Sequence, residues 1–385
     1  MVTQAAYGQE QATGAALRGG IALIEDHAEA WRALCEASAD DIPFYRPEWI
    51  ASYLKAFEPP QATVVLATAI RGGRMCAMLP LVDKRTRFCG LPVRMLQGAG
   101  NAHSCRFDLV LEAGPRGEQA IPEIWEVLKK QPGWDLIEFP LIPAAGAAEQ
   151  LIRLARKEGY LTGLYESDRS AFITLTPQDT GEEIPHDSHF RQNLRRRMRK
   201  ARAASEVRLK RITEPEASHL TRFYALERSG WKGQRHTGIA DSEATRRFYD
   251  EVSRAAAKHG YFSLYLLEFG DKLAAGHLGL SYRGKYYCPK VAYDETLSRL
   301  GPGHLMILSI LDDILPRGFS EFDFVGPWME WKAEWARGGR QHYYGYIFRP
   351  GMLGRTLHWL QFQARPAAGS LMRRMDAWRQ RLFPT

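Results

Sequence analysis

The sequence is poor in cysteine and has no long apolar segment. Its 385 residues include five cysteines, an odd number, and no CxxC pair occurs. This usage argues against a disulfide framework and a cysteine-rich zinc site, so we expect no bound metal and a reducing compartment. No apolar run reaches the roughly 18 residues that a membrane-spanning helix needs, and residues 1–20 lack the apolar core of a signal peptide. The sequence therefore predicts a cytoplasmic protein, either dissolved or bound to the inner surface of a membrane.

Positive charge is in surplus. Lys and Arg total 52 against 44 Asp and Glu, a formal net charge of +8. A basic surplus favours partners with phosphate groups, such as a nucleotide cofactor, tRNA or an anionic membrane, without choosing among them. Hydrophobic residues make up 45% of the chain and charged residues 25%, which is typical of a globular protein with a packed core.

The order of the expected elements divides the chain into two units with the same plan. Residues 1–20 are expected to form a loose, disordered tail, 21–176 a first unit, 177–190 a polar linker, 191–350 a second unit and 351–385 a basic tail. Each unit mixes helices with hairpin strands, most clearly in a three-stranded meander over 261–293. We therefore expect an α/β (α+β) fold with two lobes, each a mixed, mainly antiparallel sheet flanked by helices.

A loop with two glycines precedes a helix of the second unit, which is expected to open at about His304. A strand ends near Tyr293, and the loop that follows it reads Ser298-Arg299-Leu300-Gly301-Pro302-Gly303. The first N–H groups of a helix lack internal partners and lie at the positive end of its dipole, and glycine lets a phosphate approach the backbone. The loop is therefore a candidate pyrophosphate cradle, although an ordinary glycine loop gives the same pattern.

Several motifs occur in a fixed order between residues 40 and 348. The first unit contributes FYRPEWIASY, LPLVDK, Gly100-Asn101-Ala102-His103-Ser104 and WDLIEFPLIP. The second unit contributes Gly230-Trp231-Lys232, Ala292-Tyr293-Asp294, Pro302-Gly303, Asp323 and Lys332-Ala333-Glu334-Trp335. Together they resemble the CelD-type acetyltransferase-like family of the GNAT superfamily, which is related to the FemAB transferases and similar to bacterial ceramide synthases. The GNAT acyl-CoA loop usually reads Gln/Arg-x-x-Gly-x-Gly/Ala, whereas serine stands first here and arginine second.

The resemblance implies an enzyme with two tandem GNAT-like lobes that transfers an acyl group from acyl-CoA to an amine. The preferred acceptor is a sphingoid base or another lipid amine, and the acyl groups include long chains. One alternative is an N-acetyltransferase that acts on an amino sugar in exopolysaccharide biosynthesis. Another is a FemAB-like transferase that uses aminoacyl-tRNA, and a third is a non-enzymatic assembly factor that keeps the fold as a binding module.

Four residues of the second unit are candidates for the chemistry. His277 lies mid-strand among small residues and would accept a proton, and Tyr293 at a strand end would protonate the leaving thiolate. Asp323 lies between aromatic residues, where a carboxylate needs a partner such as Lys332 or Lys232. The structural alternatives are a satisfied core histidine, a half-buried tyrosine and a salt bridge that fixes the lobes.

Four further residues are candidate acceptor contacts. Trp231 and Lys232 follow a helix and would shape the acceptor pocket, while His103 and Asp108 would reach the cleft from the first lobe. A histidine in a loop is more often simply exposed, so His103 has that alternative.

Two segments predict basic amphipathic helices. The run RQNLRRRMRKAR (191–202) has seven Arg or Lys and no acid, with Leu194 and Met198 four residues apart. Its basic face would be solvated or would bind CoA phosphates, tRNA or lipid headgroups, and the lack of nearby aromatic residues argues against nucleic acid. In 351–385, apolar residues recur at helical spacing between arginines. This tail would lie on an anionic membrane, or pack on the core or on a second copy.

Overall fold

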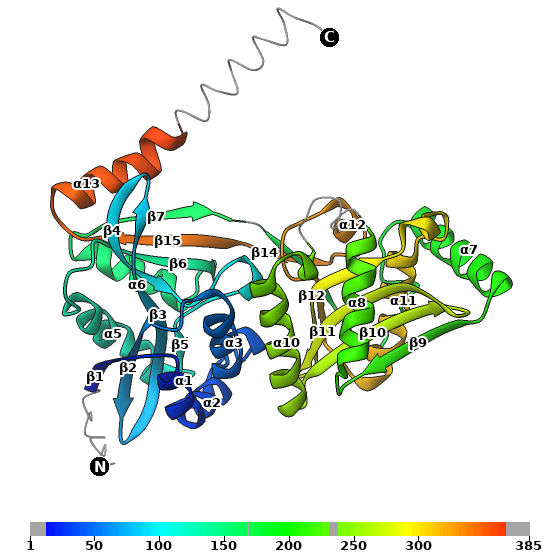
Figure 1. Ribbon diagram of the computed structural model, residues 1–385, viewed down its shortest axis with the longest axis horizontal. Coiled ribbons are helices and arrows are strands. Elements are labelled where there is room, and N and C mark those ends of the chain that lie inside the picture. The colour runs from blue at the N-terminus through cyan, green and yellow to red at the C-terminus, as the bar shows by residue number, and fades with distance from the viewer. Residues whose placement is uncertain (1–12, 168, 231–237, 367–385) are drawn as a thin grey trace, which may run out of the picture.

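The computed structural model describes residues 13–167, 169–230 and 238–366, which form two lobes joined along one side (Figure 1). The sheet of the first lobe has the strand order β1-β2-β3-β4-β6-β15-β7, with β5 paired to β3, and that of the second has the order β14-β8-β13-β12-β11-β10-β9. Most neighbouring strands are antiparallel, and β4–β6 and β12–β13 are parallel pairs. This arrangement confirms the expected fold class of two mainly antiparallel sheets flanked by helices.

The elements of the first lobe run from Thr13 to Glu166, and β15 and α13 join them from the end of the described chain. Its strands are β1 Thr13–Gly19, β2 Thr63–Arg71, β3 Arg74–Phe88, β4 Leu91–Gly98, β5 Val110–Leu111, β6 Leu136–Pro143, β7 Leu161–Glu166 and β15 His342–Phe348. Its helices are α1 Ala22–Asp26, α2 Ala28–Ala37, α3 Pro47–Phe57, α4 Pro115–Glu118, α5 Ala120–Lys129 and α6 Ala147–Lys157, and α13 Met352–Trp359 packs at one end of the sheet.

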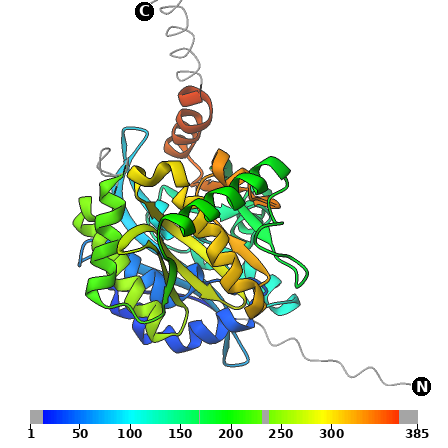
Figure 2. The same ribbon diagram turned by 90° about the vertical axis from the view of Figure 1, so that its right-hand side faces the viewer.

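The second lobe contains the expected meander and the whole of the expected basic helix. Its strands are β8 Ser170–Thr174, β9 Val207–Ile212, β10 Phe262–Phe269, β11 Lys272–Tyr282, β12 Lys285–Tyr293, β13 Glu321–Asp323 and β14 Gly338–Arg340. Its helices are α7 Ser188–Ala204, α8 Ala217–Ser229, α10 Glu243–Lys258, α11 Pro302–Ile314 and α12 Glu330–Ala333. Figure 2 shows α8 and α10 on one face of this sheet and α7 and α11 on the other, in agreement with two separate core clusters.

The chain crosses between the lobes twice, so the lobes do not follow the expected boundaries. Strand β8 lies within 21–176 but belongs to the second sheet, and β15 lies within 191–350 but belongs to the first. Strand pairing explains the difference. Strand β7 pairs with β15 in the first sheet, while β8, which follows β7, pairs with β14, which precedes β15, in the second sheet. A two-stranded ribbon therefore continues from one sheet into the next (Figure 1).

Residues 13–19, which were expected to be part of a loose tail, form an edge strand. All of β1 pairs with β2, from Thr13 opposite Ile70 to Gly19 opposite Val64. The sequence TGAALRG has few large apolar residues, so its strand character comes from this pairing rather than from a local pattern.

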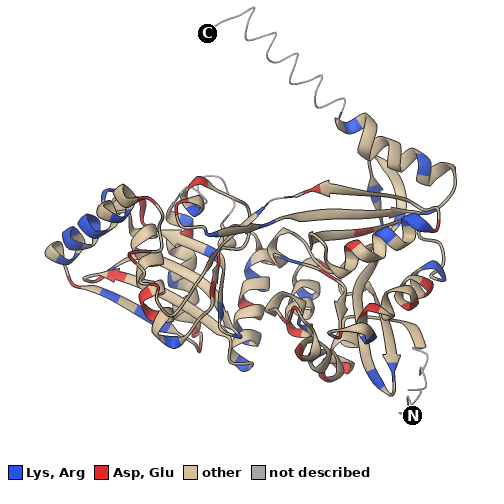
Figure 3. Ribbon diagram, turned by 180° about the vertical axis from the view of Figure 1, so that it is seen from behind, with Lys and Arg blue, Asp and Glu red and all other residues tan. Residues whose placement is uncertain are grey.

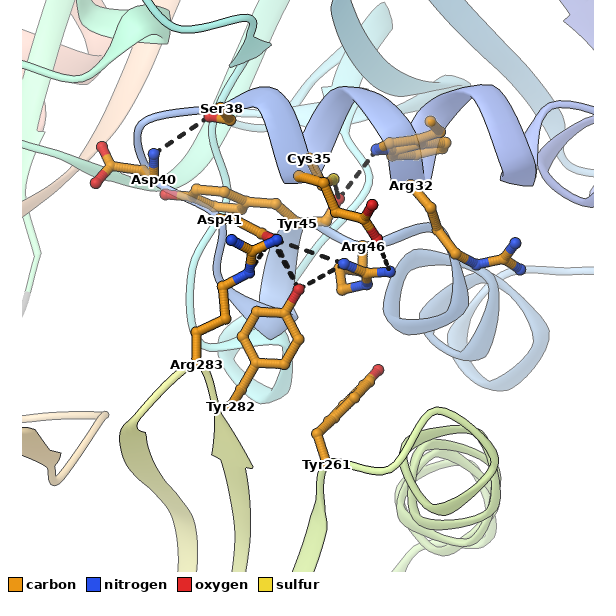
Figure 4. Close-up of polar contacts among 12 residues, drawn as sticks. Arg32, Cys35, Ser38, Asp40, Asp41, Tyr45, Arg46, Tyr261, Tyr282 and Arg283 are labelled. Carbon is orange, nitrogen blue, oxygen red and sulfur yellow. Dashed lines mark hydrogen bonds and ion pairs between the residues drawn. The ribbon is translucent and has the colours of Figure 1, made fainter. Parts of the chain in front are cut away.

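A shared core and a polar network hold the lobes together. Trp49 of α3 meets Phe248 of α10 edge to face, with ring centroids 5.4 Å apart, in a cluster that contains residues of both lobes. Beside this cluster, Tyr282 of the second lobe donates to Asp41 at 2.9 Å and accepts from Arg46, and Arg283 pairs with Asp41 at 2.6 Å (Figure 4). Because both apolar and charged groups cross the boundary, the lobes form one packed unit.

No helix within the described residues is both long and apolar enough to span a bilayer.

Candidate donor and acceptor site

The expected phosphate loop forms the entrance to α11. Residues Glu295–Leu300 form a 3₁₀ turn, Gly301 is the N-cap in the left-handed conformation (φ 63°, ψ 53°), and α11 begins at Pro302 rather than at His304. Proline suits the first helical position because its missing N–H would have had no partner. Any side chain at Gly301 would be strained by its φ, and its Cβ would lie 2.4 Å from Nη1 of Arg197.

Arg197 brings a positive charge to this helix entrance. It projects from α7, whose inner face buries Leu194 and Met198 as their spacing predicts. The Arg197 Nε is buried and has no hydrogen-bond partner among the described residues. A phosphate at the entrance would accept from this N–H and from the helix amides, so the residues present fit a phosphorylated donor.

Most of the other basic side chains of α7 are exposed, and half-buried Arg191 donates to the carbonyl of Pro185 at 2.8 Å. Figure 3 shows Lys and Arg gathered along this helix. The exposed members are Arg195, Arg196, Arg199, Lys200 and Arg202. Arg195 pairs with Glu182 at 2.6 Å, whereas the Nε of Arg197 has no hydrogen-bond partner among the described residues. The basic run therefore contains one inward arginine at α11 and a solvated basic face.

Beyond the helix entrance, the parallel strands β12 and β13 pair for only three residue pairs. The register runs from Lys285 with Glu321 to Tyr287 with Asp323, where β13 ends. Strand β12 continues to Tyr293, so its edge from Cys288 onward has no paired strand on that side within the described residues. A register shift opposite Leu278–Leu280 also places Cys288 and Pro289 in an irregular part of β12.

His277 faces Cys288 across β11 and β12. The Sγ of Cys288 and Nδ1 of His277 are 3.1 Å apart, and the two residues are 3% and 2% exposed. The His277 ring also meets Phe322 edge to face. His277 is therefore a buried histidine with a thiol partner, a pairing not expected from the sequence.

Asp323 is fully buried and pairs with two arginines. Its carboxylate lies 2.6 Å from Arg106 of the first lobe and 3.1 Å from Arg340, and its Oδ1 accepts from the N–H of Val325 at 2.9 Å. Among the described residues the partners are thus arginines rather than the expected Lys332, because Arg106 reaches across from the other lobe; Lys232 lies outside the described residues. This geometry corresponds to the structural alternative of a salt bridge that fixes the lobes.

Lys332 is buried next to this ion pair but contacts the backbone. Its Nζ donates to the carbonyls of Val325 and Pro327 at 2.7 and 2.8 Å. Both bonds hold the turn after β13, where Val325 and Gly326 have positive φ. The position of Lys332 therefore indicates that it shapes the loop that follows β13.

His103 lies at the boundary of the lobes, where it contacts the second lobe directly. Its ring stacks on Phe57 at 5.5 Å, and its Nδ1 is 3.4 Å from the hydroxyl of Tyr249. The ammonium of Lys290 lies 5.2 Å from the centre of the Tyr249 ring. Burial and the charge of Lys290 lower the pKa of His103 to about 4, so its imidazole is neutral at physiological pH. His103 is thus half-buried between the lobes and not simply exposed.

Asp108 takes a different place from the one expected. Its carboxylate accepts from the N–H groups of Ala147 and Ala148, at 3.1 and 2.6 Å, and so caps the N-terminus of α6. The segment from Arg106 to Asp108 is neither helix nor strand, so its side chains do not keep to one face: Arg106 points toward the second lobe whereas Asp108 points back into the first. Burial raises the pKa of Asp108 to about 7.

The other expected site residues lie near the entrance or outside the described part. Tyr293 is 36% exposed, and its ring is 3.6 Å from the position of a Cβ on Gly303. Ser298, Arg299 and Leu300 belong to the 3₁₀ turn before Gly301. Trp231 and Lys232 lie outside the described residues.

Sequence reasoning missed the residues that act through distant partners. These are Arg106, Arg197, Tyr249, Cys288 and Lys290. The one local signal was the basic run, within which the spacing from Leu194 and Met198 does not single out Arg197. No local pattern joins Arg106 to Asp323, which are 217 residues apart.

Comparison with known proteins agrees with this arrangement. Residues 188–333 match the model of the acetyltransferase (GNAT) domain. These residues include α7, the meander, the helix entrance and the loop that Lys332 holds. No curated protein matches the sequence.

Solved structures resemble both lobes together. FemX has a TM-score of 0.56 at 11% identity, with 83% of this chain and 96% of that chain covered. The C-terminal domain of a lysylphosphatidylglycerol synthetase from Agrobacterium fabrum has a TM-score of 0.52 at 10% identity, with 87% and 95% covered. L-PGS from Bacillus licheniformis has a TM-score of 0.50 at 11% identity, with 86% and 96% covered. At such identities the likeness shows the fold, and with the domain match it supports a transferase.

Proposed function

We propose that the protein is an acyl-CoA-dependent N-acyltransferase. The observation that carries the proposal is Arg197 at the entrance to α11, inside the segment that matches the acetyltransferase domain. The donor phosphates would accept hydrogen bonds from Arg197 and from the first amides of the helix, such as that of Gly303. The acyl end would then follow the edge of β12 toward Cys288, where β13 has ended.

The acceptor amine would enter at the boundary of the lobes, beside His103, Tyr249 and Lys290. An amine must be neutral to attack a thioester, and the ammonium of Lys290 lowers the pKa of an amine bound close to it. The neutral imidazole of His103 can accept a hydrogen bond from that amine. Trp231 and Lys232 remain predicted contacts of the acceptor, and a backbone N–H of β12 would stabilise the oxyanion.

A lipid amine, with a sphingoid base as the specific choice, is the acceptor that we favour. This choice follows the CelD-type and ceramide-synthase-like sequence motifs, and the name of the lysylphosphatidylglycerol synthetase from Agrobacterium fabrum refers to a lipid. Helix α13 supports it, because Met352, Leu353 and Trp359 are 87%, 39% and 56% exposed beside basic Arg355. Apolar and basic side chains on one exposed helix suit an anionic membrane surface.

The donor site can be tested by calorimetric titration of acetyl-CoA and palmitoyl-CoA into the wild type, Arg197→Ala and Arg195→Ala. Both variants lose one positive charge from α7, so they match in net charge. Loss of a charge-assisted hydrogen bond costs about 1.5–3 kcal/mol, so Arg197→Ala should weaken binding about 10- to 100-fold while Arg195→Ala changes it less than about threefold. Absence of binding by either thioester to the wild type would refute the proposed function.

A second candidate, an aminoacyl-tRNA-dependent transferase, is favoured by the exposed basic face of α7. Tight binding of tRNA, lost on replacing Arg199 and Lys200 with alanine, would support it. Its affinity should fall steeply between about 50 and 200 mM salt if phosphate contacts dominate. Binding of acyl-CoA without tRNA would exclude it in favour of the first proposal.

A further inference from the structure

The outer side of α7 carries positive charge that no carboxylate balances. Arg196, Arg199 and Lys200 are exposed, and none of the three forms an ion pair within the described part of the chain. Arg196 donates to the side-chain oxygen of Asn193 at 2.7 Å, which leaves its charge in place. Residues three and four apart are neighbours on a helix, where like charges repel. These three residues, the α7 patch, therefore form a surface that attracts anionic groups.

Other basic residues close to the α7 patch differ from it because acids face them. Arg195 of the same helix pairs with Glu182 at 2.6 Å, and Lys210 of β9 pairs with Glu268 at 2.8 Å. The α7 patch itself extends over residues 196–200, which is roughly 6 Å along a helix axis. This length suits a few carboxylates on one element of a protein partner.

The α7 patch adjoins the proposed donor site. Arg197 lies three residues before Lys200 on α7, and its guanidinium approaches Gly301 at the entrance to α11. The 3₁₀ turn Glu295–Leu300 packs against α7, and Arg299 in this turn is exposed. A donor whose phosphate lies at Arg197 would therefore place the group attached to that phosphate beside the α7 patch.

Two other classes of anionic partner suit this surface less well. A membrane would bury apolar side chains, whereas Phe190, Leu194 and Met198 of α7 all face the core. Helix α13, which does expose apolar residues, lies toward the other end of the molecule (Figure 1). Single-stranded nucleic acid stacks on aromatic rings, and no phenylalanine, tyrosine or tryptophan of α7 or β9 is exposed. An acidic protein needs neither kind of side chain.

We propose that the acyl group also arrives on a small acidic carrier protein, whose carboxylates dock on the α7 patch while its phosphopantetheine arm enters at α11. This inference rests on the proposed function, because the arm carries the same phosphopantetheine thioester as acyl-CoA. The amine attacks the thioester carbon, the bond from that carbon to the sulfur of the arm breaks, and the proton lost by the amine passes to that sulfur. The products are the amide and the carrier with a free thiol.

Calorimetric titration into the full-length protein tests the α7 patch. The probes are a bacterial acyl carrier protein with a palmitoyl-loaded arm, the same carrier without its arm, and palmitoyl-CoA. The patch variant, Arg199→Glu with Lys200→Glu, reverses two exposed charges. Its matched control, Arg254→Glu with Lys258→Glu, reverses two exposed charges on α10, on the other face of the sheet (Figure 2). Thermal unfolding of each variant checks that it is folded.

The expected results separate docking of the carrier from binding of its arm. The patch variant should bind the carrier at least about 10-fold more weakly, with or without the arm, because its glutamates repel the carboxylates of the carrier. Arg197→Ala should weaken binding of the loaded carrier alone, since the carrier without its arm has no phosphate for Arg197. The α10 control should change each affinity less than about threefold, and added salt should weaken docking in the wild type.

The same titrations distinguish failure of this inference from failure of the proposed function. If palmitoyl-CoA binds but neither form of the carrier does, or if the patch variant binds the carrier as well as the wild type does, the carrier inference is wrong and the N-acyltransferase stands. If no thioester binds, on CoA or on the carrier, the proposed function itself fails. If tRNA or anionic vesicles lose binding in the patch variant and the carrier does not bind, the surface serves those partners and the inference is overturned.

Discussion

The ion pair between the lobes gives the sharpest prediction about stability. Asp323→Asn keeps the size of the side chain but removes the charge that faces Arg106, whose side chain is 6% exposed, and Arg340, whose side chain is 31% exposed. Breaking a buried pair by removing one partner costs about 3–5 kcal/mol because a buried charge is left uncompensated. Arg340 keeps its bond to Glu321 at 2.5 Å, and asparagine can still accept one hydrogen bond from Arg106. We therefore expect a loss of about 3 kcal/mol in the free energy of unfolding.

Urea unfolding of the wild type and the variant measures this loss. Glu243→Gln is the control, since Glu243 and its partner Arg247 are 88% and 51% exposed, and its loss should stay below about 1 kcal/mol. Adding Arg106→Met to Asp323→Asn should recover at least half of the lost stability, because the buried arginine is then gone. A loss for Asp323→Asn no larger than that of the control would show that the pair does not hold the lobes together.

Three further outcomes follow from the helix entrance and the C-terminal helix. Burial and Arg197 lower the pKa of His304 from 6.5 to about 4, so between these pH values the unfolded chain binds more protons than the folded one. The free energy of unfolding of the wild type should therefore fall as the pH is lowered from 6.5 to 4. Chemical unfolding across that range should show a smaller fall for His304→Gln. Gly303→Trp should abolish calorimetric donor binding with little change in melting temperature, whereas Gly20→Trp, with open space around it, should bind normally. Leu357→Ala should lower the free energy of unfolding by about 2–5 kcal/mol because the side chain is fully buried. Trp359→Ala should leave the free energy of unfolding unchanged and reduce co-sedimentation with anionic vesicles. If this variant binds vesicles as well as the wild type does, α13 has no membrane role.

Local sequence patterns predicted the main elements of the second lobe. The meander was predictable because its strands are continuous apolar or alternating runs separated by two-residue turns, Gly270-Asp271 and Arg283-Gly284, and positive φ occurs at Gly270, Arg283 and Gly284. The basic helix was predictable from the spacing of Leu194 and Met198. Propensity and spacing of this kind act within a few residues, which is why they can be read along the chain.

The partners of the candidate residues were beyond such reasoning. Whether Asp323 pairs with Lys332 or with Arg106 depends on how two distant segments meet, and burial allows either as long as the carboxylate has a partner. Asp108 and His103 lie five residues apart, yet one caps a helix within its own lobe and the other contacts the second lobe. These choices are made by the packing of the lobes, so the sequence supplied candidates and the structure supplied their neighbours.

The two crossings between the sheets govern how this chain can be made and divided. During synthesis on the ribosome, β6 and β7 emerge long before β15, the strand that lies between them in the sheet. The edges of β6 and β7 that will pair with β15 therefore stay unpaired while the second lobe is synthesised. Unpaired edges are sites of aggregation, and chaperone protection during this interval would be valuable. A fragment cut at the start of the domain match, residue 188, would lack β8 and leave β13 and β14 without their shared neighbour, whereas residues 169–341 keep every strand of the second sheet.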